Sequence, residues 1–249
     1  MASPVRFPAG VNNVIYPGVT QGYNFTGVRN SHPLYNFPAP DPFRLFANAS
    51  DFGEYSTVDW TSTVVGTGSA ALTAGVGGIL AITTSATAND SVAIQHTSAD
   101  LAVPVAGYQM WYEALITPQD TVEEFLVGLQ EIITTPLSAT DGIWFHKAAN
   151  SANIDLVVSK ASTATTYSAI ATATAATAIH LAFYIDTSGN LNYYVNKSLV
   201  AQVAASTIGS LLPAGTTNLS PQFFVKNGGA AATKYLNVDY YMGAVEINR

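Results

Sequence analysis

The sequence predicts an all-β protein: a two-sheet antiparallel sandwich preceded by an irregular N-terminal arm rich in Pro and aromatic residues. From residue 51 onward, short runs of alternating apolar and polar residues recur, and Gly, Asn, Asp, Ser and Pro separate them. Residues 1–50 show neither a two-residue nor a 3.6-residue period and contain seven of the twelve prolines. We therefore divide the chain into an extended arm, residues 1–50, and a sandwich domain, residues 51–249.

The clearest strand pair is a hairpin over residues 179–196. In "IHLAFYID" the apolar residues alternate with His180, Ala182 and Tyr184, so the two sets point to opposite faces of a sheet. "TSGN" then turns the chain, with Gly189 available for a positive φ, and "LNYYVN" returns it. A second turn at "NKS" leads into "LVAQV", which extends the hairpin to a meander.

Other runs of this kind continue along the domain. They are "EYSTVDWTSTVV" (54–65), "GILAITTS" (78–85), "SVAIQHT" (91–97), "YQMWYEALIT" (108–117), "EFLVGLQEII" (124–133), "GIWFHK" (142–147), "NIDLVVSK" (153–160), "TTYSAIATAT" (165–174), "PQFFVKN" (221–227) and "YLNVDYYMGAVEIN" (235–248). A helix is the alternative for "DTVEEFLVGLQEII", but Gly128 and the surrounding strands favour a strand. This many short strands predicts a two-sheet sandwich.

Residues 161–178 consist almost entirely of Ala and Thr. Thr favours strands, and Ala lets another surface approach closely. Two interpretations stay open: a flat outer strand pair, or a close-packed contact between subunits.

Composition and charge exclude several classes of protein. The chain has no Cys, which excludes disulfide frameworks, Cys-ligated metals and thiol nucleophiles. The formal net charge of −7 argues against nucleic-acid binding, which needs clustered Lys and Arg. No apolar run is long enough to span a membrane, and the first residues do not resemble a signal peptide. We expect synthesis in a cytoplasm, with no membrane partner.

The arm differs from the domain in charge and in aromatic content. Its three arginines and single acid give it a formal charge of +2. A Pro-rich segment loses little conformational entropy on docking, and its rings can bury a large area. We therefore expect it to bind another chain, and the alternative is that it wraps over its own sandwich. The predicted partner-binding residues are Arg6, Phe7, Tyr16, Tyr23, Phe25, Arg29, Tyr35, Phe37, Phe43, Arg44 and Phe46.

No catalytic or metal-binding motif stands out. His32, His96, His146 and His180 show no metal-ligand spacing, and no phosphate-binding loop or nucleophile motif occurs. Paired acids would suit a glycosidase, and the acids that cluster are Glu113, Glu123, Glu124 and Glu131. Glu124 and Glu131 are seven residues apart and would face opposite sides of one strand. We expect no catalytic residue, no metal and no cofactor.

Carbohydrate contact is a separate alternative, since sugar rings stack on aromatic side chains. In "GIWFHK", Trp144 and His146 share the face opposite Ile143 and Phe145. The predicted sugar-facing set is Trp144, His146, Asn192 and Tyr194. Trp in a strand is more often core or interface packing.

The runs "DFGEYSTVDWTSTVV", "MWYEALITPQD", "DGIWFHK" and "FYIDTSGNLNYYVNKSLVA", in this order, resemble a concanavalin A-like (laminin G-like) jelly roll. More narrowly, the chain resembles virion structural proteins of tailed bacteriophages. That resemblance covers residues 51–249 and implies a capsid decoration (cement) protein. Such a protein binds the major capsid protein and its sister subunits on the virion surface, with a trimer favoured.

Two departures limit what the resemblance implies. The E-x-D-x-x-E strand of glucanases with this fold is absent, and the metal-binding acids of legume lectins have no clear match. We therefore expect a non-enzymatic virion component. The alternatives are a carbohydrate-binding adhesin of a phage fibre and, more distantly, a glycoside hydrolase using Glu124 or Glu131.

Overall fold

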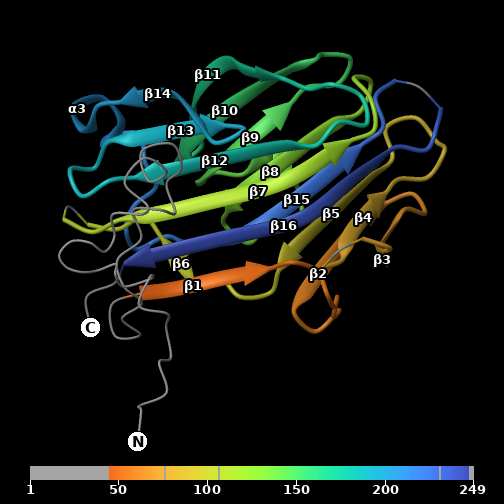
Figure 1. Cartoon of the computed structure of the whole chain (residues 1–249), viewed down its shortest axis with the longest axis horizontal. Coiled ribbons are helices and arrows are strands. Elements are labelled where there is room, and N and C mark those ends of the chain that lie inside the picture. Colours follow the sequence, from red (N-terminus) through yellow and green to blue (C-terminus); the bar gives the residue numbers. More distant parts are fainter. Residues whose placement is uncertain (1–44, 76, 106, 230, 247–249) are drawn as a thin grey trace, which may run out of the picture.

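The computed structural model describes residues 45–75, 77–105, 107–229 and 231–246. Within these residues the strands form two antiparallel sheets of eight strands each, packed face to face (Figure 1). The prediction of an all-β, two-sheet sandwich is confirmed. We call the sheet nearer the viewer in Figure 1 the front sheet and the other the back sheet.

The front sheet has the strand order β14-β13-β12-β7-β16-β4-β3, and β1 also pairs with β16. Its strands are β1 (Leu45–Ser50), β3 (Ser69–Thr73), β4 (Ile79–Thr83), β7 (Met110–Pro118), β12 (Ile179–Ile185), β13 (Leu191–Val195), β14 (Ser198–Val203) and β16 (Tyr235–Glu246).

The back sheet has the order β11-β10-β9-β8-β15-β5-β2, with β6 paired to β15. Its strands are β2 (Trp60–Val65), β5 (Ser91–His96), β6 (Leu101–Ala102), β8 (Glu124–Gln130), β9 (Gly142–Lys147), β10 (Asn153–Lys160), β11 (Thr163–Thr172) and β15 (Asn218–Lys226). Two short helices, η3 (Pro136–Ser138) and α3 (Ala205–Ile208), lie in loops.

The hairpin β12–β13 shows how local chemistry sets these elements. The Asp186 carboxylate accepts hydrogen bonds from the backbone N–H groups of Ser188 (2.9 Å) and Asn190 (3.0 Å), which closes the turn. Gly189 has a φ of +82°, as the sequence predicted. Asn196 and Lys197 also have positive φ and form the tight turn into β14. The predicted meander is therefore confirmed.

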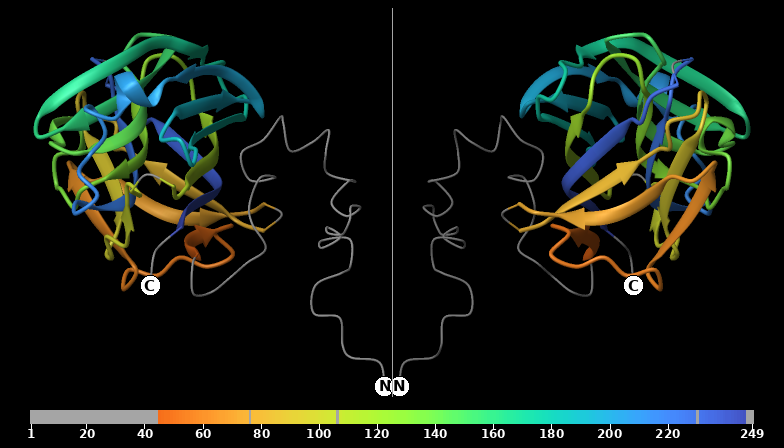
Figure 2. Two further views of the ribbon diagram at one scale, coloured as in Figure 1. Left: turned by 90° about the vertical axis from the view of Figure 1, so that its left-hand side faces the viewer. Right: turned by 90° about the vertical axis from the view of Figure 1, so that its right-hand side faces the viewer.

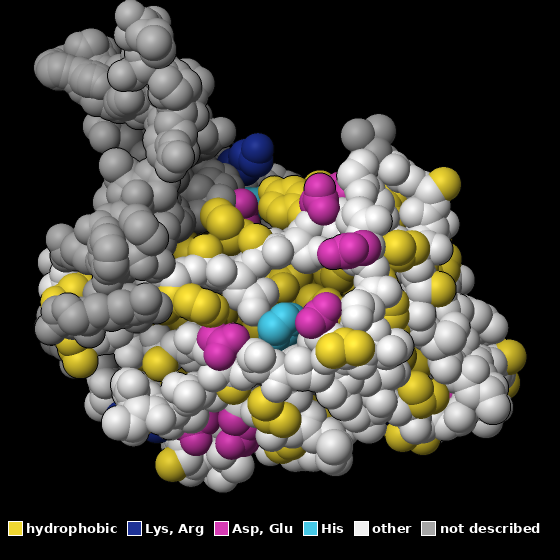
Figure 3. Space-filling view, turned by 90° about the horizontal axis from the view of Figure 1, so that it is seen from below, with side chains coloured by type: hydrophobic (Ala, Val, Ile, Leu, Met, Phe, Trp, Pro, Cys, Tyr) yellow, Lys and Arg dark blue, Asp and Glu magenta, His cyan; other side chains and the backbone are white. Residues whose placement is uncertain are grey.

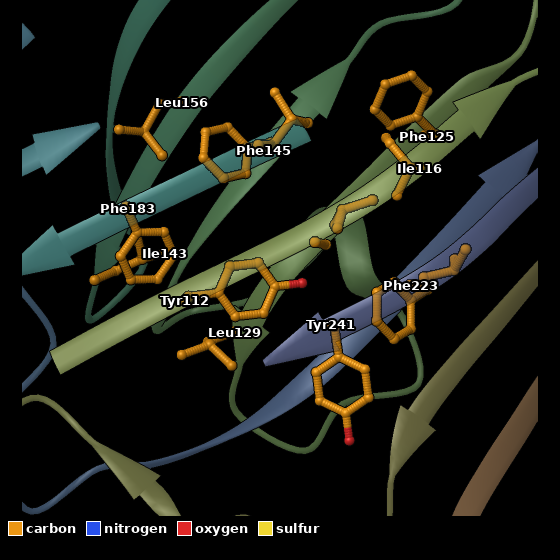
Figure 4. Close-up of a cluster of buried hydrophobic side chains, with 14 of the residues drawn as sticks. Tyr112, Ile116, Phe125, Leu129, Ile143, Phe145, Leu156, Phe183, Phe223 and Tyr241 are labelled. Atoms are coloured by element: carbon orange, nitrogen blue, oxygen red, sulfur yellow. The ribbon is translucent and has the colours of Figure 1, made fainter. Parts of the chain in front are cut away.

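The core lies between the inner faces of the two sheets (Figure 4). Tyr112 of β7 and Phe183 of β12 stack with ring centroids 5.3 Å apart, and Phe145 of β9 meets Phe183 from the back sheet. Full burial of such a side chain contributes roughly 1.5–3 kcal/mol. The core therefore fixes the strand alternation, which decides which side chains reach the two outer faces.

Two boundaries differ from those expected. Residues 45–50, predicted as the end of the arm, form β1 in the front sheet. The run 54–65 becomes a strand only at Trp60, because the N–H groups of Asp59 and Trp60 bond back to the Ser56 carbonyl in a turn. The short strands β3 and β6 had no separate prediction. The helical alternative for residues 120–133 is wrong, since residues 124–130 form β8.

The front sheet is curved when seen edge-on (Figure 2). Its edge strands, β14 on one side and β3 on the other, reach further outward than β16 between them. The outer face of the front sheet is therefore concave, with β7, β12 and β16 along its floor. The Ala/Thr-rich β11 is one edge strand of the back sheet, and a contact between subunits through residues 161–178 stays a prediction.

Candidate functional site

A carboxylate and an imidazole meet at the centre of the concave face. Glu113 lies on β7 between the core residues Tyr112 and Ala114, so its side chain points outward, and His180 does the same on β12. The His180 Nε2 and Glu113 Oε2 atoms are 2.8 Å apart, and the two side chains are only 5% and 7% exposed. Buried groups in this geometry form a charge-assisted hydrogen bond.

An open hollow of about 770 Å³ adjoins this pair. Glu113 forms part of its lining, together with Asp51 and Glu54 from the segment after β1 and Tyr240 and Met242 from β16. In the view from below, acidic side chains are spread over the surface and few basic ones are seen (Figure 3). The hollow is large enough for more than one sugar unit, since ligand pockets usually measure about 300–1,000 Å³.

Aromatic and amide side chains extend the concave face beyond the hollow. Tyr184 of β12 is partly exposed and stacks on Trp111 of β7, which is fully buried, with ring centroids 5.5 Å apart and planes 24° from parallel. The Gln202 side chain of β14 donates a hydrogen bond of 2.7 Å to the side-chain Oδ1 of Asn192 on β13. The Tyr184 hydroxyl donates to Gln109. Aromatic rings next to amide groups suit a ligand with both apolar faces and hydroxyl groups.

The Glu113–His180 pair can both hold and move a proton. A neutral imidazole carries one N–H donor and one acceptor nitrogen, and protonation turns both nitrogens into donors. Acid–base chemistry on a bound hydroxyl or glycosidic oxygen is within the reach of such a pair. Among the described residues, no group of three His, Asp or Glu side chains could hold a metal ion.

The back sheet carries a similar pair, Glu124 and His146, in a different setting. Their side chains are 3.0 Å apart on the outer face of that sheet, and Lys226 Nζ lies 3.3 Å from the other Glu124 oxygen. The hydrogen bond from His146, aided by Lys226, lowers the pKa of Glu124 below its usual value. Glu124 is thus neutralised by neighbours of its own. This pair serves as a natural reference for the front one.

The predicted sugar-facing set is split between the two sheets. Asn192 and Tyr194 of β13 alternate with the core residues Leu191 and Tyr193, so they face outward on the front sheet. Trp144 and His146 lie on the outer face of the back sheet. Trp144 is 5% exposed and packs against Ala139, Leu126 and Phe224, which removes it from an open surface. The structure does not bring the four residues together.

Of the predicted arm residues, Arg6, Phe7, Tyr16, Tyr23, Phe25, Arg29, Tyr35, Phe37, Phe43 and Arg44 lie outside the described residues. Phe46 lies in β1 and packs against the core of its own sandwich. Phe46 therefore contributes to the packing of the sandwich itself.

The acids weighed as a catalytic pair do not form one. Glu131 accepts a hydrogen bond of 2.6 Å from the Thr140 backbone N–H and so fastens a loop, while Glu124 is paired as described. Glu123 is fully buried at the β7–β8 turn. Sequence reasoning missed the Glu113–His180 pair. The alternation of "YQMWYEALIT" and "IHLAFYID" predicts that both side chains point outward. No local sequence pattern indicates that β7 and β12 are neighbouring strands.

Known structures support the fold assignment. No protein-family model matches the sequence, and no curated protein is detectably similar to it. An endo-1,3-β-glucanase from Streptomyces sioyaensis has a TM-score of 0.57 at 14% identity, over 84% of this chain and 98% of its own. A protein of unknown function from Shewanella oneidensis has a TM-score of 0.56 at 14% identity, over 94% and 99%. Peanut lectin gives 0.51 at 9%, over 82% and 99%.

These similarities correct one expectation. The prediction that the chain is not an enzyme is wrong as an inference from its fold, because the glucanase is an enzyme with the same architecture. The missing E-x-D-x-x-E strand excludes one catalytic arrangement only. In the described part of the chain, no helix is both long and apolar enough to cross a bilayer. The chain has the concanavalin A-like, lectin-type jelly-roll fold.

Proposed function

We propose that the chain binds a carbohydrate on the concave face of the front sheet, with Glu113 and His180 as the polar centre of the site. The observation that carries the proposal is this buried pair, 2.8 Å apart, beside a hollow of about 770 Å³. Tyr184 and Gln202, which are accessible to solvent, continue the same face, and the buried Trp111 and Asn192 pack against them. The lectin and glucanase neighbours are compatible with a sugar ligand.

The experiment compares two matched variants on a panel of polysaccharides. Glu113→Gln removes the charge beside the hollow, and Glu124→Gln makes the same change on the other sheet. We expect Glu113→Gln to weaken binding at least about tenfold, because a hydrogen bond to a charged group contributes about 1.5–3 kcal/mol. Glu124→Gln should leave the affinity unchanged. Affinities are measured by calorimetry, and thermal melting checks that both variants are folded.

Two results would count against this proposal. One is the absence of binding across the panel, and the other is an equal effect of the two variants. The same mixtures are also analysed for newly formed chain ends. Cleavage that is lost in Glu113→Gln would assign an acid–base role in turnover to the pair.

The finer role predicted from the sequence, a capsid decoration protein of a phage virion, stays a prediction. It is supported by the resemblance described above and by the composition of the N-terminal arm: prolines, aromatics and a net positive charge. A partner surface on the major capsid protein and a homo-oligomer, with a trimer favoured, are part of this proposal.

The truncation that tests it removes residues 1–44, because β1 begins at Leu45 and belongs to the sandwich. We expect the truncated chain to melt cooperatively but no longer to co-sediment with capsid shells. Co-sedimentation equal to that of the full chain would contradict attachment through this segment.

A further inference from the structure

The loop between β8 and β9, residues 131–141, folds over the outer face of the back sheet. Gln95 of β5 fixes its start: the side-chain amide donates to the Glu131 carbonyl (2.7 Å) and accepts from the Ile133 N–H (2.9 Å). Gln130 Nε2 donates to the Pro136 carbonyl at 2.9 Å. These three hydrogen bonds therefore fix the loop over the outer face of the back sheet.

Beneath this cover lies a buried amide that the protein does not satisfy. Gln222 of β15 is fully buried, between Gln95 on one neighbouring strand and Gly128 on the other. Neither its Nε2 nor its Oε1 has a hydrogen-bond partner among the described residues. An amide left in this state destabilises a protein by about 1–3 kcal/mol, so its presence calls for an explanation.

Gln222 lines a cavity that opens toward solvent. The inner part measures about 60 Å³, enough for about two waters, and includes Thr61 and Thr63 in its lining. An outer part of about 260 Å³ shares Thr63, Ala93 and Thr134 with it. Together they form one recess between the loop and strands β2, β5 and β15.

The lining of this recess indicates the chemistry of its ligand. Most of its polar groups are neutral hydroxyls and amides, from Thr63, Asn89, Ser91 and Gln222 among others, and the His96 imidazole also lines it. Phe224 and Leu137 supply apolar surface. The Lys226 ammonium in the lining is already paired with Glu124 at 3.3 Å. Uncharged donors and acceptors around an apolar surface suit a small ligand with several hydroxyl groups.

We propose that this recess is a second binding site, on the opposite side of the sandwich from Glu113, for a single neutral sugar unit. The Gln222 amide donates to one hydroxyl of the sugar through Nε2 and accepts from another through Oε1. Two waters take these bonds in the free protein. The site does not depend on the function proposed for the concave face.

The test uses the full chain, labelled with ¹⁵N, and D-glucose, D-galactose and D-mannose as probes in turn. We expect at least one sugar to cause saturable shifts in the resonances of residues 133–137 and in the side-chain amide of Gln222. Gln222→Leu should abolish the shifts in the loop. This variant is expected to fold, because an apolar side chain of similar size replaces an unpaired amide.

Gln202→Leu is the matched control, since it makes the same change on the front sheet and should leave the shifts intact. Should Gln222→Leu fail to fold, Thr63→Val takes its place and is expected to weaken the shifts. Glu113→Gln should also leave them intact, which separates this site from the concave one. The proposal is overturned if none of the three sugars shifts the loop, or if the shifts survive in the Gln222 and Thr63 variants.

Discussion

Four charged side chains gather at the turn between β7 and β8, and one of them titrates near neutral pH. Glu123 is fully buried and accepts a hydrogen bond from the Asp120 N–H. Burial, together with the neighbouring Asp120 carboxyl, raises the pKa of Glu123 to about 7. Hydrogen bonds, above all those from Glu123 and Lys234, outweigh burial and lower the pKa of Asp120. Lys147 is the fourth charged residue, and its ammonium group donates a hydrogen bond to the Thr121 carbonyl oxygen.

This arrangement predicts a pH-dependent stability. Between the ordinary Glu pKa of 4.5 and about 7, the folded state holds a proton on Glu123 that the unfolded state has released. Stability should therefore fall as the pH rises through this window, by up to roughly 3 kcal/mol at about 1.4 kcal/mol per pKa unit. Glu123→Gln should be more stable than the native protein at pH 8 and have a flatter profile.

Melting temperatures from pH 5 to pH 8 provide the measurement. Glu131→Gln is the control, because glutamine keeps a carbonyl oxygen for the Thr140 N–H. A native profile as flat as that of Glu123→Gln would contradict the assignment.

At the scale of the elements, the register of the back sheet depends on a glycine. Gly128 of β8 pairs with Trp144 of β9, and a Cβ atom at this position would lie 2.5 Å from both the Ile143 carbonyl oxygen and the Trp144 Cα. A side chain cannot be accommodated without moving the strands. The glycine therefore permits the close approach of β8 and β9 beneath the 131–141 loop.

Gly128→Ala should destabilise the protein by about 1–3 kcal/mol, the usual cost of overpacking. The matched control is Gly229→Ala, where nothing lies within 4 Å of the added carbon. Urea unfolding of both variants measures the difference. Equal stability of the two would show that the strands separate more easily than the structure indicates.

Strands with local signals were predictable, whereas contacts between distant strands were not. Alternation and turn residues predicted β12, β13 and β14 with their connections. The pairing of β7 with β12 joins residues about 70 positions apart, Glu113 and His180 among them, and no local pattern encodes it. β1 escaped prediction for the same reason, since its partner β16 lies at the far end of the domain.

The burial of individual side chains could not be predicted from the sequence either. The shared face of Trp144 and His146 was inferred correctly from alternation. The 131–141 loop that covers Trp144 was not foreseen, because its anchors Gln95 and Gln130 look like ordinary strand residues. A surface aromatic was therefore expected where the structure has a covered one.

At the scale of the whole molecule, the two outer faces of the sandwich differ in shape, in the neighbours of their Glu–His pairs and in how far a loop covers them. The front face is concave and open, with a paired Glu and His beside a hollow. On the back face, the Glu124–His146 pair lies next to Lys226, and the 131–141 loop covers part of the sheet. This contrast is why we propose the main ligand site on the front sheet and a smaller site in the recess on the back sheet.

The most direct test of this account is a crystal structure of the chain with the tightest-binding oligosaccharide from the panel. We predict electron density for sugar rings along the concave face, with hydroxyl groups within hydrogen-bond distance of Glu113 or His180. Density for the oligosaccharide elsewhere on the molecule, with the concave face empty, would contradict the account.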